Sequence, residues 1–125
     1  MTKNHFIKTI TPILNEYRLP RNSENQCADV CEAIRITAEQ AGVKARICYV
    51  SVGLIGHNVL TFGDEVVDFT LSQFVIMEDF PYRCKIGSKK FKKVYSGLVY
   101  SDNHWDWRSG SSKLIDKLKK SLKGD

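Results

Sequence analysis

The sequence predicts an α+β protein in which an antiparallel β-sheet packs against helices. Two helical patterns open the 125-residue chain, several strand-like segments then follow one another directly, and an amphipathic helix closes it. Consecutive strands without intervening helices are typical of antiparallel sheets. Because a chain of this length can bury a substantial core, we expect residues 1–125 to form a single domain.

The first helix is expected near the N-terminus and ends before Leu19. Pro12 lacks a backbone N–H, so it is expected either to kink this helix or to delay its start. The apolar side chains that recur at near-helical spacing are Phe6, Ile7, Ile10, Leu14 and Tyr17.

The second helix is expected within RNSENQCADVCEAIRITAEQAG. Ser23 and Gln26 are spaced as a capping box, Asn25 is an alternative cap, and Gly42 is a stop signal. The apolar stripe of this helix includes Cys27, which places a thiol in its first turn.

The remaining elements are four strand-like segments and a helix. Ala45–Val52 is rich in β-branched and aromatic residues, and His57–Phe62 and Glu65–Thr70 flank a glycine-containing turn, Gly63-Asp64. Lys90–Tyr100 is expected to form another strand, or two short ones interrupted by Gly97. A helix beginning at Ser111 or Ser112 then carries leucines on one face and lysines on the other.

The hairpin brings His57 and Asp68 together if its turn contains two residues. Phe62 then lies opposite Glu65, and His57 and Asp68 become diagonal neighbours on one face, with Cβ atoms roughly 7 Å apart. A three-residue loop would place them on opposite faces. An aspartate in the apolar strand VVDFT needs a partner, and a carboxylate would orient the imidazole and stabilise its protonated form.

Cys27 is the candidate nucleophile. The unsatisfied N–H groups and the dipole of a helix N-terminus favour a thiolate, and a neighbouring imidazolium favours it further. Gln26 is expected either to donate a hydrogen bond to an oxyanion or to complete the capping box. We expect Cys31, Cys48 and Cys84 to be structural, and we expect no metal or other cofactor because Cys27 and Cys31 lack a matching second pair of ligands.

The order of a cysteine at a helix start followed by a histidine and an aspartate on strands resembles the transglutaminase-like and papain-like cysteine enzyme superfamily. The matching residues are Cys27 in NQCADVCEAIRITAEQAGVKAR, His57 in GHNVLTF and Asp68 in VVDFTLSQF. The last segment is similar to the DxTxxQF ending of small bacterial and phage members. The usual aromatic residue two positions after the histidine is replaced by Val59.

The resemblance implies a transglutaminase-like core and acyl transfer through a thioester. Cys27 would be the nucleophile, His57 the general base and then acid, and Asp68 the orienting residue. A protein or peptide amide would be the substrate, making the protein a peptidase or deamidase with water as acceptor, or a transglutaminase with an amine. Trp105 and Trp107 are expected either to line a substrate groove or to plug the gap between the sheet and the last helix.

The charge distribution supports an alternative function. Nineteen Lys and Arg residues against fourteen Asp and Glu give a net charge of +5, with lysines concentrated in Ser88–Lys93 and Lys113–Lys123. Such a surface either keeps the protein soluble or, in a non-catalytic module of the same fold, binds nucleic acid or an acidic protein weakly. We expect no membrane association and a cytoplasmic location, because the N-terminus lacks the apolar core of a secretory signal.

Overall fold

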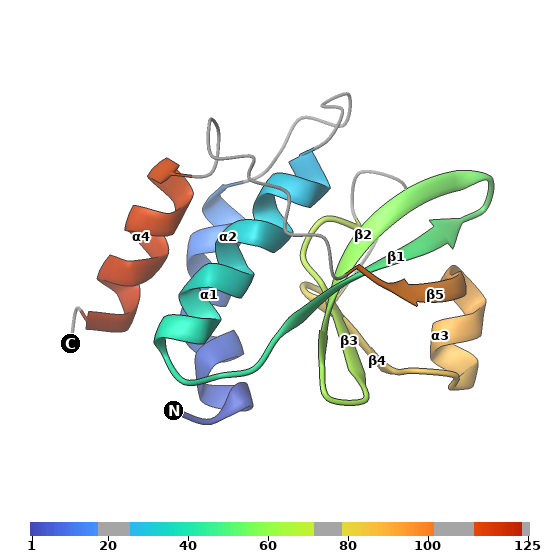
Figure 1. The fold of residues 1–125 in the computed structure, drawn as a ribbon, viewed down its shortest axis with the longest axis horizontal. Helices are drawn as coiled ribbons and strands as arrows, with labels where there is room; N and C mark the ends of the chain where they lie inside the picture. The colour runs from blue at the N-terminus through green and yellow to red at the C-terminus, as the bar shows by residue number, and fades with distance from the viewer. Residues whose placement is uncertain (18–25, 72–78, 102–111, 124–125) are drawn as a thin grey trace.

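The computed structural model describes residues 1–17, 26–71, 79–101 and 112–123. These residues form the α+β fold that the sequence predicts, with four helices and a five-stranded antiparallel sheet (Figure 1). In chain order the elements are α1 (Lys3–Glu16), α2 (Gln26–Gln40), β1 (Arg46–Val52), β2 (Ile55–Phe62), β3 (Glu65–Asp68), β4 (Tyr82–Lys85), α3 (Lys89–Val94), β5 (Ser96–Tyr100) and α4 (Ser112–Lys123).

The sheet has the strand order β4-β3-β2-β1-β5, and every neighbouring pair is antiparallel. Phe62 lies opposite Glu65, which confirms that the β2–β3 turn contains only Gly63 and Asp64. Gly63 has a φ of 65°, a left-handed conformation that glycine adopts without a steric cost. The register on which the His57–Asp68 prediction depends is therefore the observed one.

Each face of the sheet carries its own apolar cluster. Figure 1 shows α1, α2 and α4 on one side of the sheet and α3 on the other. On the first side, Leu60, Phe62 and Val67 pack against residues of the three long helices. On the second side, the cluster consists of Cys48, Val50, Val59, Val66, Leu71, Cys84, Phe91 and Tyr95. Because strand side chains alternate between faces, His57 shares the second face with Val59.

Helix α2 ends as the sequence predicts. Gly42 has a φ of 75°, its N–H donates to the Glu39 carbonyl, and the N–H of Val43 donates to the carbonyl of Ala38 at 2.8 Å. This pair of bonds is a Schellman motif, which provides donors for carbonyl groups in the last turn that have no partner within the helix. The helix begins at Gln26, whereas the predicted caps Ser23 and Asn25 lie outside the described residues.

Of the two effects expected from Pro12, a kink or a late start, the late start is not observed. Helix α1 begins at Lys3, where the hydroxyl of Thr2 caps it by accepting from the N–H of His5, and Pro12 lies within it. A proline removes one internal hydrogen bond, but here the buried apolar stripe extends through both halves of the helix. That stripe consists of Phe6, Ile7, Ile10 and Leu14.

The prediction of a strand over the first half of Lys90–Tyr100 was wrong. Lys89–Val94 is helix α3, and only Ser96–Tyr100 is a strand. The Ser88 hydroxyl caps the helix by accepting from the N–H of Phe91, which is buried while the lysines around it are exposed. The six-residue helix buries this single ring and keeps four lysines in water, and one apolar position between lysines is too little to establish either a helical or a strand period. The sequence also gave no indication of β4, which has only four residues.

Candidate active site

The centre of the candidate site is a buried hydrogen bond between His57 and Asp68. Nε2 of His57 lies 2.7 Å from Oδ2 of Asp68, and the two residues are 0% and 2% exposed. A carboxylate only accepts hydrogen bonds, so Nε2 carries the proton and donates. The predicted contact is confirmed, because the two-residue turn places both side chains on the same face of the sheet.

The Asp68 carboxylate has partners on both oxygens. Oδ1 accepts from the backbone N–H of Thr70 at 2.9 Å and from its hydroxyl at 3.3 Å. Oδ2 accepts from His57 and also from the hydroxyl of Tyr95 at 2.6 Å. These donors offset the desolvation of a buried carboxylate, which is otherwise several kcal/mol.

Tyr95 is a site residue that sequence reasoning missed. It lies 27 positions from Asp68 and directly after α3, a helix that the sequence did not predict. Burial, followed by the negative charge of Asp68, raises the pKa of the Tyr95 phenol. The hydroxyl therefore stays protonated at all physiological pH values and can serve as a donor.

The surroundings of the pair are apolar and closed. His57 and Asp68 lie on the same face of the sheet as the second apolar cluster, which includes Val59, Val66 and Tyr95, and the Nδ1 atom of His57 is buried as well. Electrostatic interactions are stronger in such an environment than in water, because the effective dielectric constant is lower. The pair is thus held in a fixed geometry, with Nδ1 on the ring edge away from the Nε2–Oδ2 bond.

Gly56, immediately before His57, allows a close approach of another side chain. The ring of Tyr49 on β1 occupies the space that a Cβ atom at this position would need. Tyr49 itself is half exposed. A side chain larger than glycine at position 56 would displace the Tyr49 ring from its place beside His57.

Cys27, the predicted nucleophile, is the second residue of α2. Its side chain and that of Gln26 lie outside the described part of the structure, as do Trp105 and Trp107. Figure 1 shows the N-terminal end of α2 directed toward β2 and the C-terminal end farther from that strand. One turn after Cys27, the Sγ atom of Cys31 lies 3.6 Å from the carbonyl oxygen of Asn58, the neighbour of His57.

Three cysteines have the structural character that the sequence predicts. Cys31, Cys48 and Cys84 are buried and form no disulfide. Burial raises the pKa of the Cys48 thiol and raises that of Cys84 to about 11. Both Cys48 and Cys84 are therefore thiols rather than thiolates at neutral pH and are poor nucleophiles.

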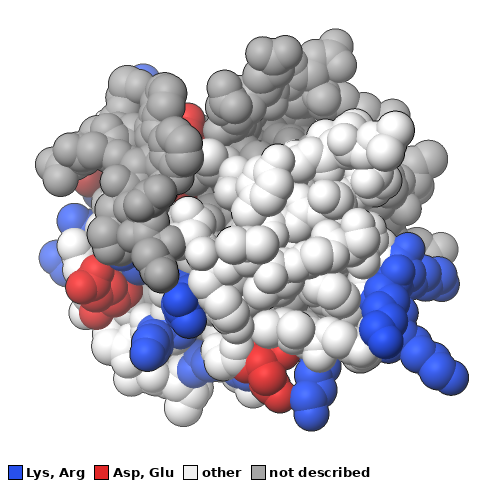
Figure 2. Space-filling view, turned by 45° about the vertical axis from the view of Figure 1, so that its right-hand side comes forward, with Lys and Arg blue, Asp and Glu red and all other residues white. Residues whose placement is uncertain are grey.

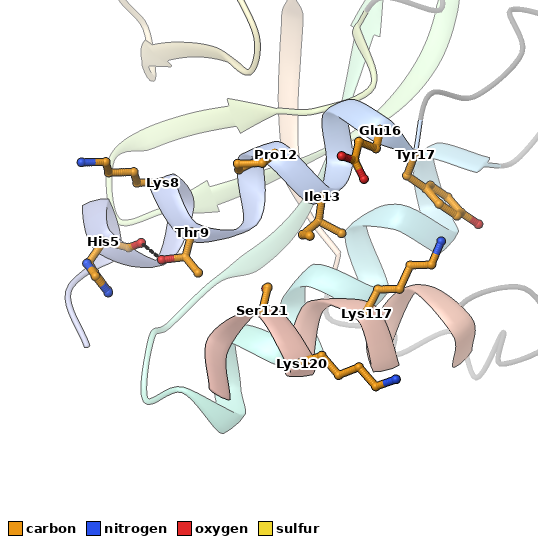
Figure 3. A pocket seen from close by; sticks show the side chains of 10 residues that line it. All are labelled: His5, Lys8, Thr9, Pro12, Ile13, Glu16, Tyr17, Lys117, Lys120 and Ser121. Atoms are coloured by element: carbon orange, nitrogen blue, oxygen red, sulfur yellow. Dashed lines mark hydrogen bonds between the residues drawn. The ribbon is translucent and has the colours of Figure 1, made fainter. Parts of the chain in front are cut away.

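A separate groove of about 720 Å³ lies between α1 and α4. Its cationic side chains, among them Lys8, Lys117 and Lys120, point in different directions rather than toward a common centre (Figure 3). The Nζ atom of Lys117 lies 5.9 Å from the centroid of the Tyr17 ring. Among the described residues that line the groove, neither His57 nor Asp68 is present, and the side chains do not converge on a ligand position.

Comparisons with protein-family models, curated proteins and solved structures gave no match. Within the described segments, no helix is both long and apolar enough to cross a membrane. In the same segments, no three His, Cys, Asp or Glu side chains are grouped so as to hold a metal ion.

Proposed function

We propose that the protein is a cysteine-dependent acyl-transfer enzyme with a transglutaminase-like core and a Cys27-His57-Asp68 triad. The observation that carries the proposal is the buried 2.7 Å bond between Nε2 of His57 and Oδ2 of Asp68. Because Asp68 holds the proton on Nε2, Nδ1 is the nitrogen that would take a proton from a nucleophile. Asp68 also stabilises the imidazolium that this transfer creates.

The position of Cys27 at the start of α2 supports it as the nucleophile. The contact between the Cys31 Sγ atom and the Asn58 carbonyl oxygen brings this helix to β2, on the face of the sheet opposite to the one that the His57 side chain occupies, so Cys27 would have to reach the imidazole around the end of β2. Cys27 lies four residues closer to the helix N-terminus, about 6 Å along the axis. At that end, the backbone N–H groups and the dipole of the helix would stabilise both a thiolate and the oxyanion of a tetrahedral intermediate.

The proposed reaction proceeds in two transfers of an acyl group. The Cys27 sulfur attacks an amide carbonyl carbon, the C–N bond breaks, and the leaving amine takes the proton held by His57. The resulting thioester is attacked by water or by a second amine, whose proton passes to His57 as the C–S bond breaks. Water yields a carboxylic acid and makes the protein a peptidase or deamidase, whereas an amine yields a new amide.

The proposal predicts an activated thiol at position 27. Native protein is treated with iodoacetamide from pH 4.5 to pH 9, and modification of each cysteine is followed by peptide mass spectrometry. We expect Cys27 to react with a midpoint well below about 8.5, the value of an ordinary thiol. His57→Ala should return this midpoint toward about 8.5 and slow the reaction at pH 6 at least tenfold.

Cys27→Ser identifies the reactive site in the same experiment, because the iodoacetamide labelling at low pH should be absent from this variant. Ammonia release from glutamine-containing proteins and incorporation of a fluorescent amine then distinguish hydrolysis from amine transfer. If Cys27 titrates as an ordinary thiol and His57→Ala leaves its profile unchanged, the proposed triad is wrong.

The charges on α3 favour a second candidate function, a non-catalytic module that binds nucleic acid. Lys89, Lys90, Lys92 and Lys93 are all exposed on this helix. Figure 2 shows cationic side chains gathered at the right-hand side of the molecule, where α3 lies. Lysines displayed together on one short element give a local positive potential that attracts phosphates.

This candidate predicts salt-sensitive binding that does not need the thiol. Affinity for a fluorescent single-stranded RNA should fall steeply between about 50 and 200 mM salt, and Cys27→Ala should leave it unchanged. Lys92→Glu with Lys93→Glu should weaken binding at least tenfold. The double variant Lys113→Glu with Lys123→Glu on α4, which changes the net charge equally, serves as the control. Equal losses in the two double variants, or a flat salt dependence, would contradict specific binding by α3.

A further inference from the structure

The Asp68 carboxylate has a second donor on the very oxygen that holds His57. The hydroxyl of Tyr95 lies 2.6 Å from Oδ2, and Nε2 of His57 lies 2.7 Å from the same atom. Thr70 occupies the other oxygen through its N–H and hydroxyl. The two oxygens of the carboxylate therefore have different partners. Oδ1 accepts from Thr70, two residues along the chain, whereas Oδ2 accepts from both the His57 imidazole and the distant Tyr95.

Tyr95 is held rigidly in this position. Its N–H donates to the carbonyl of Phe91 at 2.8 Å and closes α3, and the residue is 3% exposed. Its ring packs against the rings of Phe91 and Tyr82, with centroid distances of 5.3 and 6.1 Å. A side chain fixed by backbone and ring contacts can aim its hydroxyl at Oδ2 with little further loss of conformational entropy.

We propose that Tyr95 is a positioning residue that fixes Oδ2 of Asp68 and limits how strongly this oxygen attracts the His57 imidazolium. This inference rests on the proposed function, in which Asp68 orients His57. A hydrogen-bond donor on Oδ2 partly neutralises the negative charge of that oxygen. The oxygen then attracts the proton on Nε2 of His57 less strongly. Tyr95 thereby acts on His57 through Asp68 and has no contact with the reacting atoms in this scheme.

The test compares Tyr95→Phe with Tyr82→Phe. Both changes remove one hydroxyl from the same aromatic cluster, but the Tyr82 hydroxyl donates to the carbonyl of Lys90 rather than to Asp68. The ring nitrogens of His57 are followed by NMR against pH in each variant. We expect Tyr95→Phe to raise the midpoint of the His57 titration by about one pH unit. This shift corresponds to the free energy that a hydrogen bond to a charged group contributes. Tyr82→Phe should leave the midpoint within about 0.2 units of the native value.

A measurement on the native protein covers the case in which Tyr95→Phe does not fold. The Tyr95 hydroxyl proton should exchange slowly and show a nuclear Overhauser effect to the proton on Nε2 of His57, because both protons point at Oδ2. If this effect is absent, or if Tyr95→Phe moves the His57 midpoint no more than Tyr82→Phe does, the role of Tyr95 is wrong.

The failure of this inference is distinguishable from failure of the proposed function. A shift of the His57 midpoint together with an unreactive Cys27 supports Tyr95 as the residue that tunes His57 and overturns the thiol enzyme. An unshifted midpoint together with His57-dependent labelling of Cys27 overturns the role of Tyr95 and leaves the enzyme in place.

Discussion

Asp68 is the residue whose surroundings determine the character of the site. Its carboxylate is 2% exposed and accepts hydrogen bonds from His57, Thr70 and Tyr95. Each of these donors meets an oxygen of the carboxylate that accepts it. The carboxylate is therefore held on both oxygens, and its position orients the imidazole and stabilises the positive charge that the imidazole gains on protonation.

Replacing this carboxylate should destabilise the fold. Asp68→Asn keeps the size of the side chain but turns an NH₂ group toward either the His57 and Tyr95 donors or the Thr70 donors. We expect the free energy of unfolding, measured by urea denaturation, to fall by about 3 kcal/mol, the upper end of the cost of leaving a buried hydrogen-bond donor without an acceptor.

Asp64→Asn is the matched control for this measurement. Its carboxylate is 71% exposed and pairs with Lys85 at the surface, at 3.5 Å. We expect a change within about 0.5 kcal/mol there. Comparable losses at positions 64 and 68 would show that the buried network does not contribute the stability that its geometry implies.

Two short elements set the geometry of the site. The turn at Gly63 and Asp64 fixes the register of β2 against β3 and so places His57 and Asp68 on one face. Helix α3 then positions Tyr95 at its C-terminal end. A loop one residue longer would invert one strand relative to the other, because side chains alternate with a period of two.

Helix α3 has two roles: it exposes four lysines and it positions Tyr95 at the candidate site. In the sequence, this segment is recognisable only as a run of charged residues. Phe91 anchors the helix to the second face of the sheet, while the four lysines remain in water. The same packing that exposes the lysines therefore brings Tyr95 to the candidate active site. A variant that displaces Phe91 would disturb both features, so charge changes at the exposed lysines are the cleaner test of binding.

At the scale of the molecule, Glu65 joins segments that are distant in sequence. Its carboxylate accepts from Arg83 on β4 at 2.7 and 2.8 Å and lies 3.1 Å from the Nζ atom of Lys3 on α1. Arg83 also donates to Asn4 at 2.8 Å, which strengthens the connection between β4 and α1. This network connects the N-terminal helix to β4 and to β3, the strand that carries Asp68.

The network predicts a loss of stability in acid. The Arg83 hydrogen bonds, opposed by burial and assisted by Lys3, hold the pKa of Glu65 below its ordinary value of 4.5. A lowered carboxyl pKa contributes stability that is present above the ordinary value and is lost as the pH falls through the folded-state value. The melting temperature of the native protein should thus exceed that of Glu65→Gln at pH 7, and the difference should shrink as the pH falls below 4.5 through the folded-state value.

Glu39→Gln provides the comparison for this pH series. Glu39 is 77% exposed and pairs with Arg35 at 3.5 Å, a surface contact that contributes little to stability. We expect the melting temperature of this variant to follow that of the native protein at every pH. A difference between the native protein and Glu65→Gln that persists unchanged in acid would contradict the assigned role of Glu65.

The sequence by itself determined the features that depend on neighbours along the chain. The α+β class, the Gly42 stop of α2 and the His57–Asp68 contact follow from local spacing, because a hairpin with a two-residue turn leaves only one register. Helix α3 was missed because one turn of helix held by Ser88 and Phe91 leaves too few residues to distinguish its period from that of a strand. The nearness of Cys27 to His57 remains a prediction.

Only the tertiary structure decided which residues complete the buried network. Tyr95 reaches Asp68 because α3, which follows the edge strand β4, packs on the second face of the sheet, and no spacing in the sequence encodes that approach. The His57–Asp68 contact arises from backbone geometry over 11 residues, whereas the Tyr95–Asp68 contact spans 27 residues and depends on how the aromatic cluster packs. A contact between segments that are not paired in one hairpin is fixed by packing, and packing is a property of the whole fold.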